Sequence, residues 1–380
     1  MIIGIDASNI RATGAANLNE LLRVADPLAH GFDRIIIWIR GEAIDKVDDM
    51  DWLCKVHEPL LDRSMPFRLF WQRLRLKKLA EAAGCDVLYV LSGSDASGFK
   101  PMVTISQNLL PFEWREMRRF GLSLYTLKFL LLRWTQSNSF HKADGLIFLT
   151  QYARNAVLKV TGPLRGKNVI IPHGINPRFF QQPRTQRLSK EFDHTKPCRV
   201  LYVSVVDVYK HQCMVATAVA QLRSSGVPII LELIGPASRS VNKLKKTINR
   251  IDSEGAFINY RGAVPHEELH KFYKSADIGI FASSCENLPN ILLEGMAAGL
   301  PMACSSMGPM PEVLGDAGVY FNPENSHDIA RALSELINSS DLRVQFAQAA
   351  FERAQQYSWK ESADKTFDFL AKIANKQIGI

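Results

Sequence analysis

The sequence alternates short apolar runs with longer segments of helical length, and this alternation limits the folds that the chain can adopt. Apolar runs typical of buried strands recur along most of its length. We predict strands at Ile2–Ile5, Ile35–Ile39, Val87–Val90, Met102–Ile105, Gly145–Leu149, Val200–Val206, Ile229–Ile234, Phe257–Tyr260, Ile278–Phe281, Pro301–Cys304 and Gly318–Phe321. Repeated strand-then-helix units favour an α/β fold with parallel, doubly wound sheets. Because 380 residues exceed what one core usually supports, we predict two such domains.

The segment from Phe281 to Pro301 carries the clearest chemical pattern, F-A-S-S-C-E-N-L-P-N-I-L-L-E-G-M-A-A-G-L-P. A predicted strand ends at Phe281, and Pro289 suits the first turn of a helix because its missing N–H costs nothing there. Glu286 then lies in the connecting loop and Glu294 in the helix. Free N–H groups at a helix start attract anions, and two carboxylates accept hydrogen bonds from sugar hydroxyls. The plainer interpretation is that Glu286 caps the helix while Glu294 faces solvent.

Residues 273–301 closely resemble the signature of family-four glycosyltransferases, which are retaining enzymes of the GT-B fold; among them this chain looks like the bacterial cell-surface polysaccharide type. The resemblance is strong over the second half of the chain and weak over the first. It implies two Rossmann-like, doubly wound parallel-sheet domains that face a central cleft. It also implies that the second domain binds a nucleotide-diphosphate sugar as co-substrate, that the first binds the acceptor, and that neither a metal nor another cofactor takes part.

The resemblance further assigns roles to individual residues. Lys210 would neutralise the diphosphate, Glu286 would orient the donor sugar, and Glu294 would hold the ribose. The catalytic residues that it implies are Glu286, Lys210 and Gln107; the donor-binding residues are Gly14, Ala15, Lys210, Arg261, Gly262, Glu286, Asn287, Leu288, Asn290 and Glu294.

Three positions depart from the family pattern. The glycine-rich loop is reduced to Gly14-Ala15-Ala16, Gln107 stands where a histidine is usual, and Val205 stands where an arginine is usual. A glutamine cannot act as a general acid or base at neutral pH. These departures keep open a second reading, in which the chain is a non-catalytic GT-B scaffold or a sensor of sugar nucleotides.

Other motif matches favour ordinary structure. Asp49-Met50-Asp51 matches a metal-binding D-x-D but lies in an acidic loop, so a solvated turn is expected. The H-E-x-x-H match at residues 266–270 resembles a zinc site, but the same stretch matches an ordinary helix of the family, and we expect that helix, opened by Pro265 and His266. A nicotinamide-dependent dehydrogenase should carry G-x-G-x-x-G with an acidic residue about 20 positions on, and the sequence lacks this set.

Basic and aromatic residues gather in the first half of the chain. Between Arg63 and Arg133 there are 12 basic and 5 acidic residues, and they concentrate in Pro66–Leu79 and Trp114–Trp134. Such segments suit the interface of an anionic membrane. Alternatively, both helices pack on the sheet and extend their long side chains to solvent. No recognised nucleic-acid-binding module accompanies the charge, so no nucleic-acid partner is expected.

We predict a first domain at 1–180, a linker at 181–197, a second domain at 198–357 and a C-terminal helix at 358–380 that crosses back to the first domain.

Six scattered cysteines and the absence of a basic leader predict a cytoplasmic protein, at the inner face of a bacterial plasma membrane if the basic segments bind lipid. The resemblance implies transfer of a hexose, with mannose among the candidates, with retention of configuration. The basic, aromatic first domain suits a lipid-linked or polysaccharide acceptor. Lipopolysaccharide, O-antigen and exopolysaccharide biosynthesis are processes that use such transfers.

Overall fold

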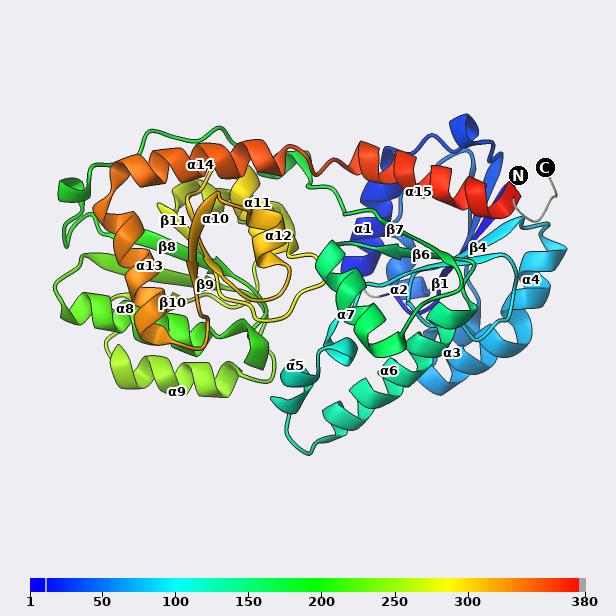
Figure 1. Cartoon of the computed structure of the whole chain (residues 1–380), viewed down its shortest axis with the longest axis horizontal. Helices are drawn as coiled ribbons and strands as arrows, with labels where there is room; N and C mark the ends of the chain where they lie inside the picture. The colour runs from blue at the N-terminus through cyan, green and yellow to red at the C-terminus, as the bar shows by residue number, and fades with distance from the viewer. Residues whose placement is uncertain (11, 376–380) are drawn as a thin grey trace. The chain divides into compact units, whose positions relative to one another are not determined.

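The structure is a computed structural model that describes residues 1–10 and 12–375. Internal contacts divide the chain into two compact units (Figure 1). The first unit comprises Met1–Met117, Leu122–Gly174 and the chain from Ser358 onward. Arg118–Gly121 and Ile175–Tyr357 form the second unit. The boundary after Gly174 lies six residues before the predicted one, and the segment predicted as a linker belongs to the second unit.

The first unit contains a seven-stranded sheet in which every strand pairs with its neighbours in parallel. The strands are β1 (Ile2–Ala7), β2 (Arg34–Ile39), β3 (Leu53–Val56), β4 (Val87–Val90), β5 (Met102–Ile105), β6 (Gly145–Phe148) and β7 (Lys167–Ile170), in the order β3-β2-β1-β4-β5-β6-β7. Its helices are α1 (Ala12–Arg23), α2 (Gly41–Ile44), α3 (Met65–Trp71), α4 (Lys77–Ala82), α5 (Trp114–Arg118), α6 (Leu124–Lys142), α7 (Gln151–Thr161) and α15 (Trp359–Ala374). Runs of isoleucine and valine fill the central strands because β-branched side chains suit a sheet that is covered on both faces.

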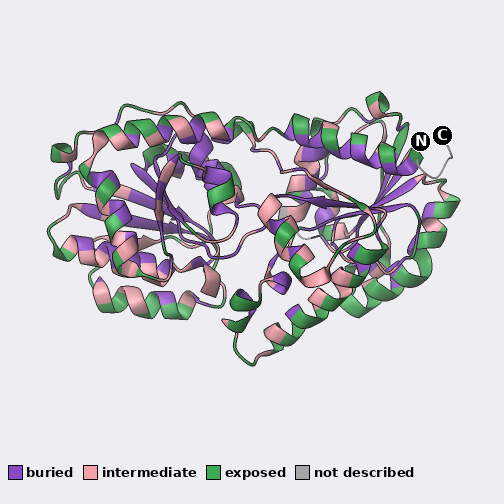
Figure 2. Cartoon of the chain, in the orientation of Figure 1, coloured by how far each residue is buried: buried purple, intermediate pink, exposed green. Residues whose placement is uncertain are grey.

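The second unit contains a six-stranded parallel sheet in the order β10-β9-β8-β11-β12-β13. The strands are β8 (Cys198–Val203), β9 (Ile229–Ile234), β10 (Ile258–Tyr260), β11 (Ile278–Phe281), β12 (Met302–Ser305) and β13 (Gly318–Phe321). The helices are α8 (Gln212–Ser224), α9 (Val241–Ile251), α10 (Leu269–Ser275), α11 (Asn290–Ala297), α12 (Met310–Leu314), α13 (Ser326–Asn338) and α14 (Ser340–Ala354). Helix α8 packs against α9 and α13, whereas α11 packs against α12 and α14. The central strands are buried in both units, and most outward helix faces are exposed (Figure 2).

The predicted α/β fold with two doubly wound parallel sheets is confirmed, and four elements need correction. Strands β3 and β7 were not predicted, because they lie at the two sheet edges and are only partly buried, with Cys54 and Lys167 exposed. Helix α10 begins at Leu269, after a short 3-10 turn, rather than at Pro265. Helix α1 begins before Gly14, so this residue lies in the first turn of a helix and not in a loop.

The C-terminal helix α15 belongs to the first unit, where it packs against α1, β4 and β6. Ser358 caps its start by accepting a hydrogen bond from the N–H of Glu361. Phe369 lies so close to β6 that a Cβ added at Gly145 would come within 2.8 Å of its ring. A glycine at this place in β6 therefore lets the helix approach the sheet closely.

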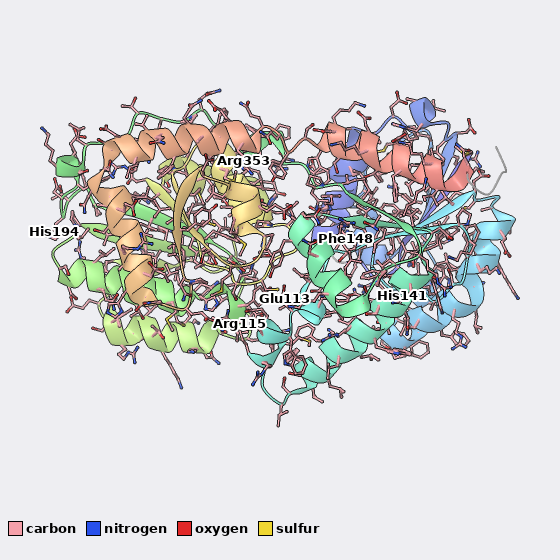
Figure 3. All side chains as sticks on the ribbon, in the orientation of Figure 1. Glu113, Arg115, His141, Phe148, His194 and Arg353 are labelled. Carbon is pink, nitrogen blue, oxygen red and sulfur yellow. The ribbon has the colours of Figure 1, made fainter. Side chains whose placement is uncertain are left out.

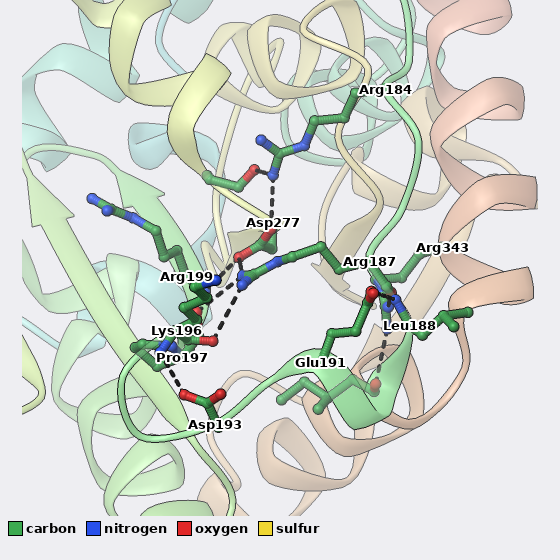
Figure 4. A network of polar contacts seen from close by, with 12 residues as sticks. Arg184, Arg187, Leu188, Glu191, Asp193, Lys196, Pro197, Arg199, Asp277 and Arg343 are labelled. Atoms are coloured by element: carbon green, nitrogen blue, oxygen red, sulfur yellow. Dashed lines mark hydrogen bonds and ion pairs between the residues drawn. The ribbon is translucent and has the colours of Figure 1, made fainter.

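An ion-pair network fastens the start of the second unit to its sheet (Figure 4). Asp277, just before β11, accepts hydrogen bonds from Arg184 Nη2 at 2.8 Å and Arg187 Nη2 at 2.5 Å, and from the N–H of Arg199 at 2.9 Å. The buried guanidinium of Arg343 in turn donates to the carbonyl of Arg187. These contacts lie at the amino ends of the strands, and they hold residues 184–187 against the sheet.

Candidate functional site

The strand order of the second sheet reverses between β8 and β11. Strands β9 and β10 follow β8 toward one edge of the sheet, and β12 and β13 follow β11 toward the other edge. In open α/β sheets, ligands bind at the carboxyl ends of the strands where the order reverses. Lys210 lies in the loop after β8, and Glu286 lies in the loop after β11. Both predicted residues are therefore at the position where this fold binds ligands.

Lys210 and Glu286 form an ion pair between these two loops. Their side chains are only 7% and 16% exposed, so little solvent screens the pair. The ammonium group also lies over the rings of Tyr209, at 5.1 Å, and Phe281, at 5.4 Å. Two opposite charges removed from water are stable only when both are paired. A ligand anion at this place would consequently compete with Glu286 for the lysine.

Hydrogen bonds hold the turn that carries Lys210 in place. Asp207 caps the turn by accepting from the next backbone N–H at 2.8 Å. The hydroxyl of Tyr202 donates to the carbonyl of Lys210 at 2.6 Å, and the N–H of Ser284 donates to the carbonyl of Tyr209 at 2.9 Å. The two loops at the reversal point are thus tied to each other through backbone as well as side-chain contacts.

The start of α11 follows the Glu286 loop. Asn287 and Leu288 are buried, and Pro289 immediately precedes the helix, as its position in the sequence predicts. The side-chain Oδ1 of Asn290 is buried and has no hydrogen-bond partner among the described residues. A buried acceptor without a partner is costly, so this oxygen is available to a donor group of a ligand or a water.

Glu294, the second carboxylate of the predicted pair, already has partners on both oxygens. His266 Nε2 lies 3.1 Å from Oε1, and the hydroxyl of Tyr273 donates to Oε2 at 3.0 Å. The ring of Phe179 packs edge-on against both aromatic partners. The hydrogen bond to Glu294 raises the pKa of His266, and burial raises the pKa of Tyr273. Glu294 is neither a solvated residue nor a free one, and a ribose hydroxyl would have to share it with His266 or Tyr273.

Arg261 is bound to a buried carboxylate of the neighbouring strand. Its Nε donates to Glu232 at 2.5 Å, and Asn259 donates to the other oxygen of Glu232 at 3.1 Å. The hydrogen bond to Glu232 raises the pKa of Arg261, and the guanidinium lies 5.6 Å from the centre of the Phe272 ring. Gly262 has a φ of +74°, and its carbonyl accepts from the N–H of Gly235. Arg261 therefore presents a flat, fixed surface rather than a free charge.

A second arginine near the Lys210 loop was missed by the sequence analysis. Arg239 follows β9, and its Nη1 donates to Asp207 Oδ2 at 2.8 Å. Its charge is close enough to lower the pKa of Tyr209, against the larger upward effect of burial. The residue sits on another strand's loop than Val205, where the family pattern expects an arginine. A search limited to that one loop could not have found it.

In the first unit, Gly14 and Gln107 line a common pocket with His173 and Trp359. Among the described residues that line this pocket none is an Asp, Glu, Lys or Arg. Ala15, predicted to bind the donor, is fully buried and is not among those residues. The pocket therefore brings together two of the three residues predicted for this unit, in uncharged surroundings.

His173 is the other unexpected feature of this pocket. The imidazole is buried and stacks on Trp359, with ring centres 5.3 Å apart. Burial lowers the pKa of His173 to about 4, so the ring is neutral at physiological pH. Its Nδ1 is buried and has no hydrogen-bond partner in the described chain. The following Gly174 permits this arrangement, because a Cβ there would lie 2.1 Å from the backbone nitrogen of Trp359.

Residues 184–353 match the family model described as Glycosyl transferases group 1. Over these residues, which are less than half of the chain, the sequence is similar to that family. The matched segment contains Lys210, Arg239, Arg261, Glu286 and Glu294, and thus every charged residue of the site in the second unit.

Two curated relatives illustrate the match. The sulfoquinovosyl transferase SQD2 of Arabidopsis thaliana is 24% identical over 253 residues, which cover 63% of this chain and 47% of the relative. The O-antigen chain mannosyltransferase B of Escherichia coli is 30% identical over 125 residues, which cover 33% of this chain and 32% of the relative. The alignments thus span about half of these relatives' length or less.

Solved structures resemble the chain over its whole length. Sucrose-phosphate synthase from Thermosynechococcus elongatus has a TM-score of 0.75 at 16% identity, with 100% of this chain and 99% of that chain covered. HepE from Anabaena, in complex with UDP, has a TM-score of 0.67 at 16% identity, with both chains fully covered (100%). At such identities the likeness concerns the fold, which is GT-B.

Proposed function

We propose that the chain is a glycosyltransferase that moves a hexose from a nucleotide-diphosphate sugar to a lipid-linked or polysaccharide acceptor, with retention at the anomeric carbon. The observation that carries the proposal is the Lys210–Glu286 ion pair at the strand-order reversal of the second sheet. It provides a cation for a diphosphate and a carboxylate for sugar hydroxyls at the place where the fold binds ligands. The UDP in HepE and the mannosyl transfer named for the Escherichia coli relative support this class of donor.

The chemistry follows from charge. When the bond between the anomeric carbon and the diphosphate oxygen breaks, the leaving oxygen takes up the electron pair and gains negative charge. A preorganised cation such as Lys210, together with the N–H groups at the start of α11, would stabilise this charge in a site shielded from water. Binding of the diphosphate would release Glu286 from the lysine, and the freed carboxylate would accept hydrogen bonds from the sugar.

The remaining donor contacts are assigned by position along the same unit. Glu294 would accept from the ribose, and Asn290 Oδ1 would take a donor group of the ligand. The fixed guanidinium of Arg261 over Phe272 would offer a flat surface near the base. Arg239 would replace the cation that Val205 lacks, if the diphosphate drew it away from Asp207. Neither a metal nor another cofactor enters this proposal.

A second candidate function, a scaffold or sensor that binds sugar nucleotides without transfer, is favoured by one observation. Both oxygens of Glu294 and the charge of Lys210 are occupied by neighbours in the protein itself. A site with its polar groups already paired has less to gain from a ligand than an open one.

One experiment separates the two functions. The protein is screened against UDP- and GDP-sugars for thermal stabilisation, and each stabilising donor is then followed for transfer and hydrolysis, with the anomeric configuration of the product read by NMR. We expect stabilisation by one base class and turnover with retention. Binding without any turnover would establish the scaffold, and no stabilisation by any nucleotide sugar would refute both functions. Glu286→Gln provides a matched variant, since it keeps the size of the side chain and removes the charge.

A further inference from the structure

We propose that α3 and α6 of the first unit form a surface that binds an anionic lipid bilayer. We call it the α3–α6 surface. Its apolar members are Met65, Phe67, Leu69, Phe70, Leu74, Leu124, Leu127, Leu131 and Trp134, all exposed, and its basic members are Arg73, Arg75, Lys77, Lys78 and Lys128. The binding itself is independent of the donor site, whereas its purpose, to bring the enzyme to a lipid-linked acceptor, rests on the proposed function.

Helix α6 presents one row of apolar residues to solvent, while Phe129, Phe140, Gln136 and Ser139 are buried. Leu124, Leu127, Leu131 and Trp134 follow the spacing of one helix face and are 84%, 64%, 55% and 65% exposed. Such a row would normally face a core, because burial of apolar area is the main driving force of folding. An apolar row turned outward instead marks a surface that meets an apolar partner.

Hydrogen bonds fix α6 in this orientation. On the opposite side of the helix, Gln136 donates to the carbonyl of Ser92 at 3.3 Å. The hydroxyl of Ser139, also buried, accepts from the N–H of Asp95 at 2.9 Å. A rotation that buried the apolar row would expose these contacts and leave buried backbone groups without partners. The outward apolar row is thus a consequence of how the helix is held.

The segment that includes α3 has the same character. Phe67 and Phe70 are more than half exposed, and Leu74 on the following π-helical turn is 50% exposed. The sequence pattern places Trp71 on the same stripe, but its ring is buried and its Nε1 donates to Glu58 at 2.7 Å. One aromatic therefore anchors the helix while its neighbours stay in solvent.

Both helical segments rest on one loop. Gln72, at the end of α3, donates to the carbonyl of Ser94 at 3.3 Å, and Thr135 of α6 lies 3.4 Å from the hydroxyl of the same serine. Both helical segments therefore contact the loop that contains Ser94, and Figure 1 shows α3 and α6 as neighbours within the first unit.

The charges on the surface have one sign. Neither 64–80 nor 124–142 contains an aspartate or a glutamate. Arg75 pairs with Glu58 and Lys77 with Glu81. Arg73, Lys78 and Lys128 form no ion pair within the part of the chain that the structure describes, and Lys128 stands between the exposed leucines of α6. Arginine and lysine beside exposed aromatics suit lipid headgroups above an acyl boundary, since the charges meet phosphates while the rings enter the interface.

A second copy of the chain is a less suitable occupant. Two copies that met through this surface would bring Arg73, Lys78 and Lys128 of both copies together, and none of the three has an acidic partner among the described residues. A bilayer supplies both the negative charge and the apolar phase. Among the described residues, no helix has the length and apolar character to cross a membrane, so the proposed attachment is peripheral.

Sedimentation with vesicles tests the charged part of the surface. The full chain is mixed with vesicles of phosphatidylcholine and phosphatidylglycerol in equal amounts, or of phosphatidylcholine alone. We expect binding to the anionic vesicles that weakens with salt and falls by about tenfold or more when Arg73, Arg75, Lys77 and Lys78 are changed together to glutamine. The matched control changes Lys243, Lys245, Lys246 and Arg250 of α9, which removes the same charge from a helix without large exposed apolar residues. Equal loss in both variants would overturn the proposal.

Substitutions in α6 test the apolar part. Leu124→Gln, Leu127→Gln and Leu131→Gln together should lower anionic vesicle binding by about tenfold or more and abolish the blue shift of Trp134 fluorescence. Leu28→Gln with Val344→Gln is the control, since both residues are exposed elsewhere. All variants should keep the stabilisation by nucleotide sugars, so failure of the donor site would be seen separately. A dimer in analytical ultracentrifugation that the α6 triple variant dissociates, or retention by RNA with no vesicle binding, would replace the bilayer with another partner.

Discussion

The two sheets reverse their strand order in the same way, but the side chains at the two reversal points differ in character. In the second unit, between β8 and β11, the groups are charged and already paired, with Lys210 bound to Glu286. In the first unit, where the order reverses between β1 and β4, the pocket that holds Gly14 and Gln107 has a neutral histidine and no charged residue among its described lining. One architecture thus serves two chemistries. Under the proposed function, the charged groups of the second unit would bind the diphosphate, and the uncharged pocket of the first unit would suit a hydroxyl-bearing group.

Removal of Lys210 should have the largest effect on activity. With Val205 in place of the usual arginine, Lys210→Ala would remove the main cation from the proposed diphosphate site. We expect turnover to fall by about 10²–10³, the scale for loss of one preorganised group at a developing charge. Steady-state kinetics with the identified donor would measure it, and Lys210→Arg should restore only a part.

Gln107→Ala is the matched change at the first reversal point. Glutamine offers hydrogen bonds but no proton to transfer, so its loss should cost less than that of Lys210. Equal losses of turnover in Lys210→Ala and Gln107→Ala would contradict the distinction between a charged site in the second unit and a neutral site in the first. Near-normal transfer by Lys210→Ala would mean that another cation, with Arg239 the first to examine, holds the diphosphate.

The buried histidine predicts how stability depends on pH in the first unit. Burial holds the pKa of His173 at about 4, against 6.5 in the unfolded chain. Between these values the unfolded chain binds a proton that the folded chain does not, so the free energy of unfolding falls as pH falls from 6.5 to 4 and is unaffected above 6.5. The difference amounts to about 3 kcal/mol at most.

His173→Asn should flatten this dependence, as denaturant unfolding at a series of pH values would show. His194→Asn serves as the control, because this histidine is exposed on the surface of the second unit (Figure 3). The same acid sensitivity in His173→Asn and the unchanged protein would mean that carboxylates, not His173, set it.

Most of the fold could be predicted because its strands carry a local signal. Buried parallel strands are continuous apolar runs, and all were predicted except the two edge strands β3 and β7, which leave Cys54 and Lys167 exposed. Sequence could not reveal that residues 184–187 are fixed to Asp277, since this contact joins residues about 90 positions apart. A polar, proline-containing segment is typical of a linker, and the sequence alone does not show contacts to residues that are distant in the chain.

The candidate site was predicted only in part, because short motifs are visible in the sequence and contacts between distant segments are not. Glu286, Glu294 and Lys210 lie in motifs with fixed spacing, whereas Arg239 and His173 become visible only once the strands are placed side by side. His266 is the clearest case: its pattern reads as half of an H-E-x-x-H helix, yet its ring is turned to Glu294. Periodicity shows which face of a helix a residue occupies, but not the partner that it meets there.

Loss of either carboxylate should be milder than loss of Lys210. Glu286→Ala and Glu294→Ala should each weaken donor binding or turnover by about 1.5–3 kcal/mol, the scale for a hydrogen bond to a charged group. Titration calorimetry with the donor, beside circular dichroism to verify the fold, would measure the effect. Glu286→Ala leaves the buried charge of Lys210 unpaired, which destabilises the folded state, so this variant should also unfold at a lower temperature. Unchanged donor affinity and rate in both variants would remove the pair from the donor site.

The smallest effect concerns the hydrogen bond between His266 and Glu294. Its pH dependence has the opposite sign to that of His173 in the first unit, because the pKa of His266 is raised and the pKa of His173 is lowered. The pKa of His266 is raised above 6.5, mainly by this bond, with further charges from Glu267 and Arg178 nearby. The stability that the charged pair contributes is therefore present below 6.5 and lost as pH rises through the folded pKa. In the same window His266 releases its hold on Glu294, so donor affinity should rise with pH. Because the imidazole is about half exposed, we expect no more than about a threefold change. Donor titrations across this window would show the step in the unchanged protein and its absence in His266→Gln, which keeps a hydrogen-bond donor but carries no charge. A step of equal size in His266→Gln would assign the titration to another group and leave His266 with a purely structural contact.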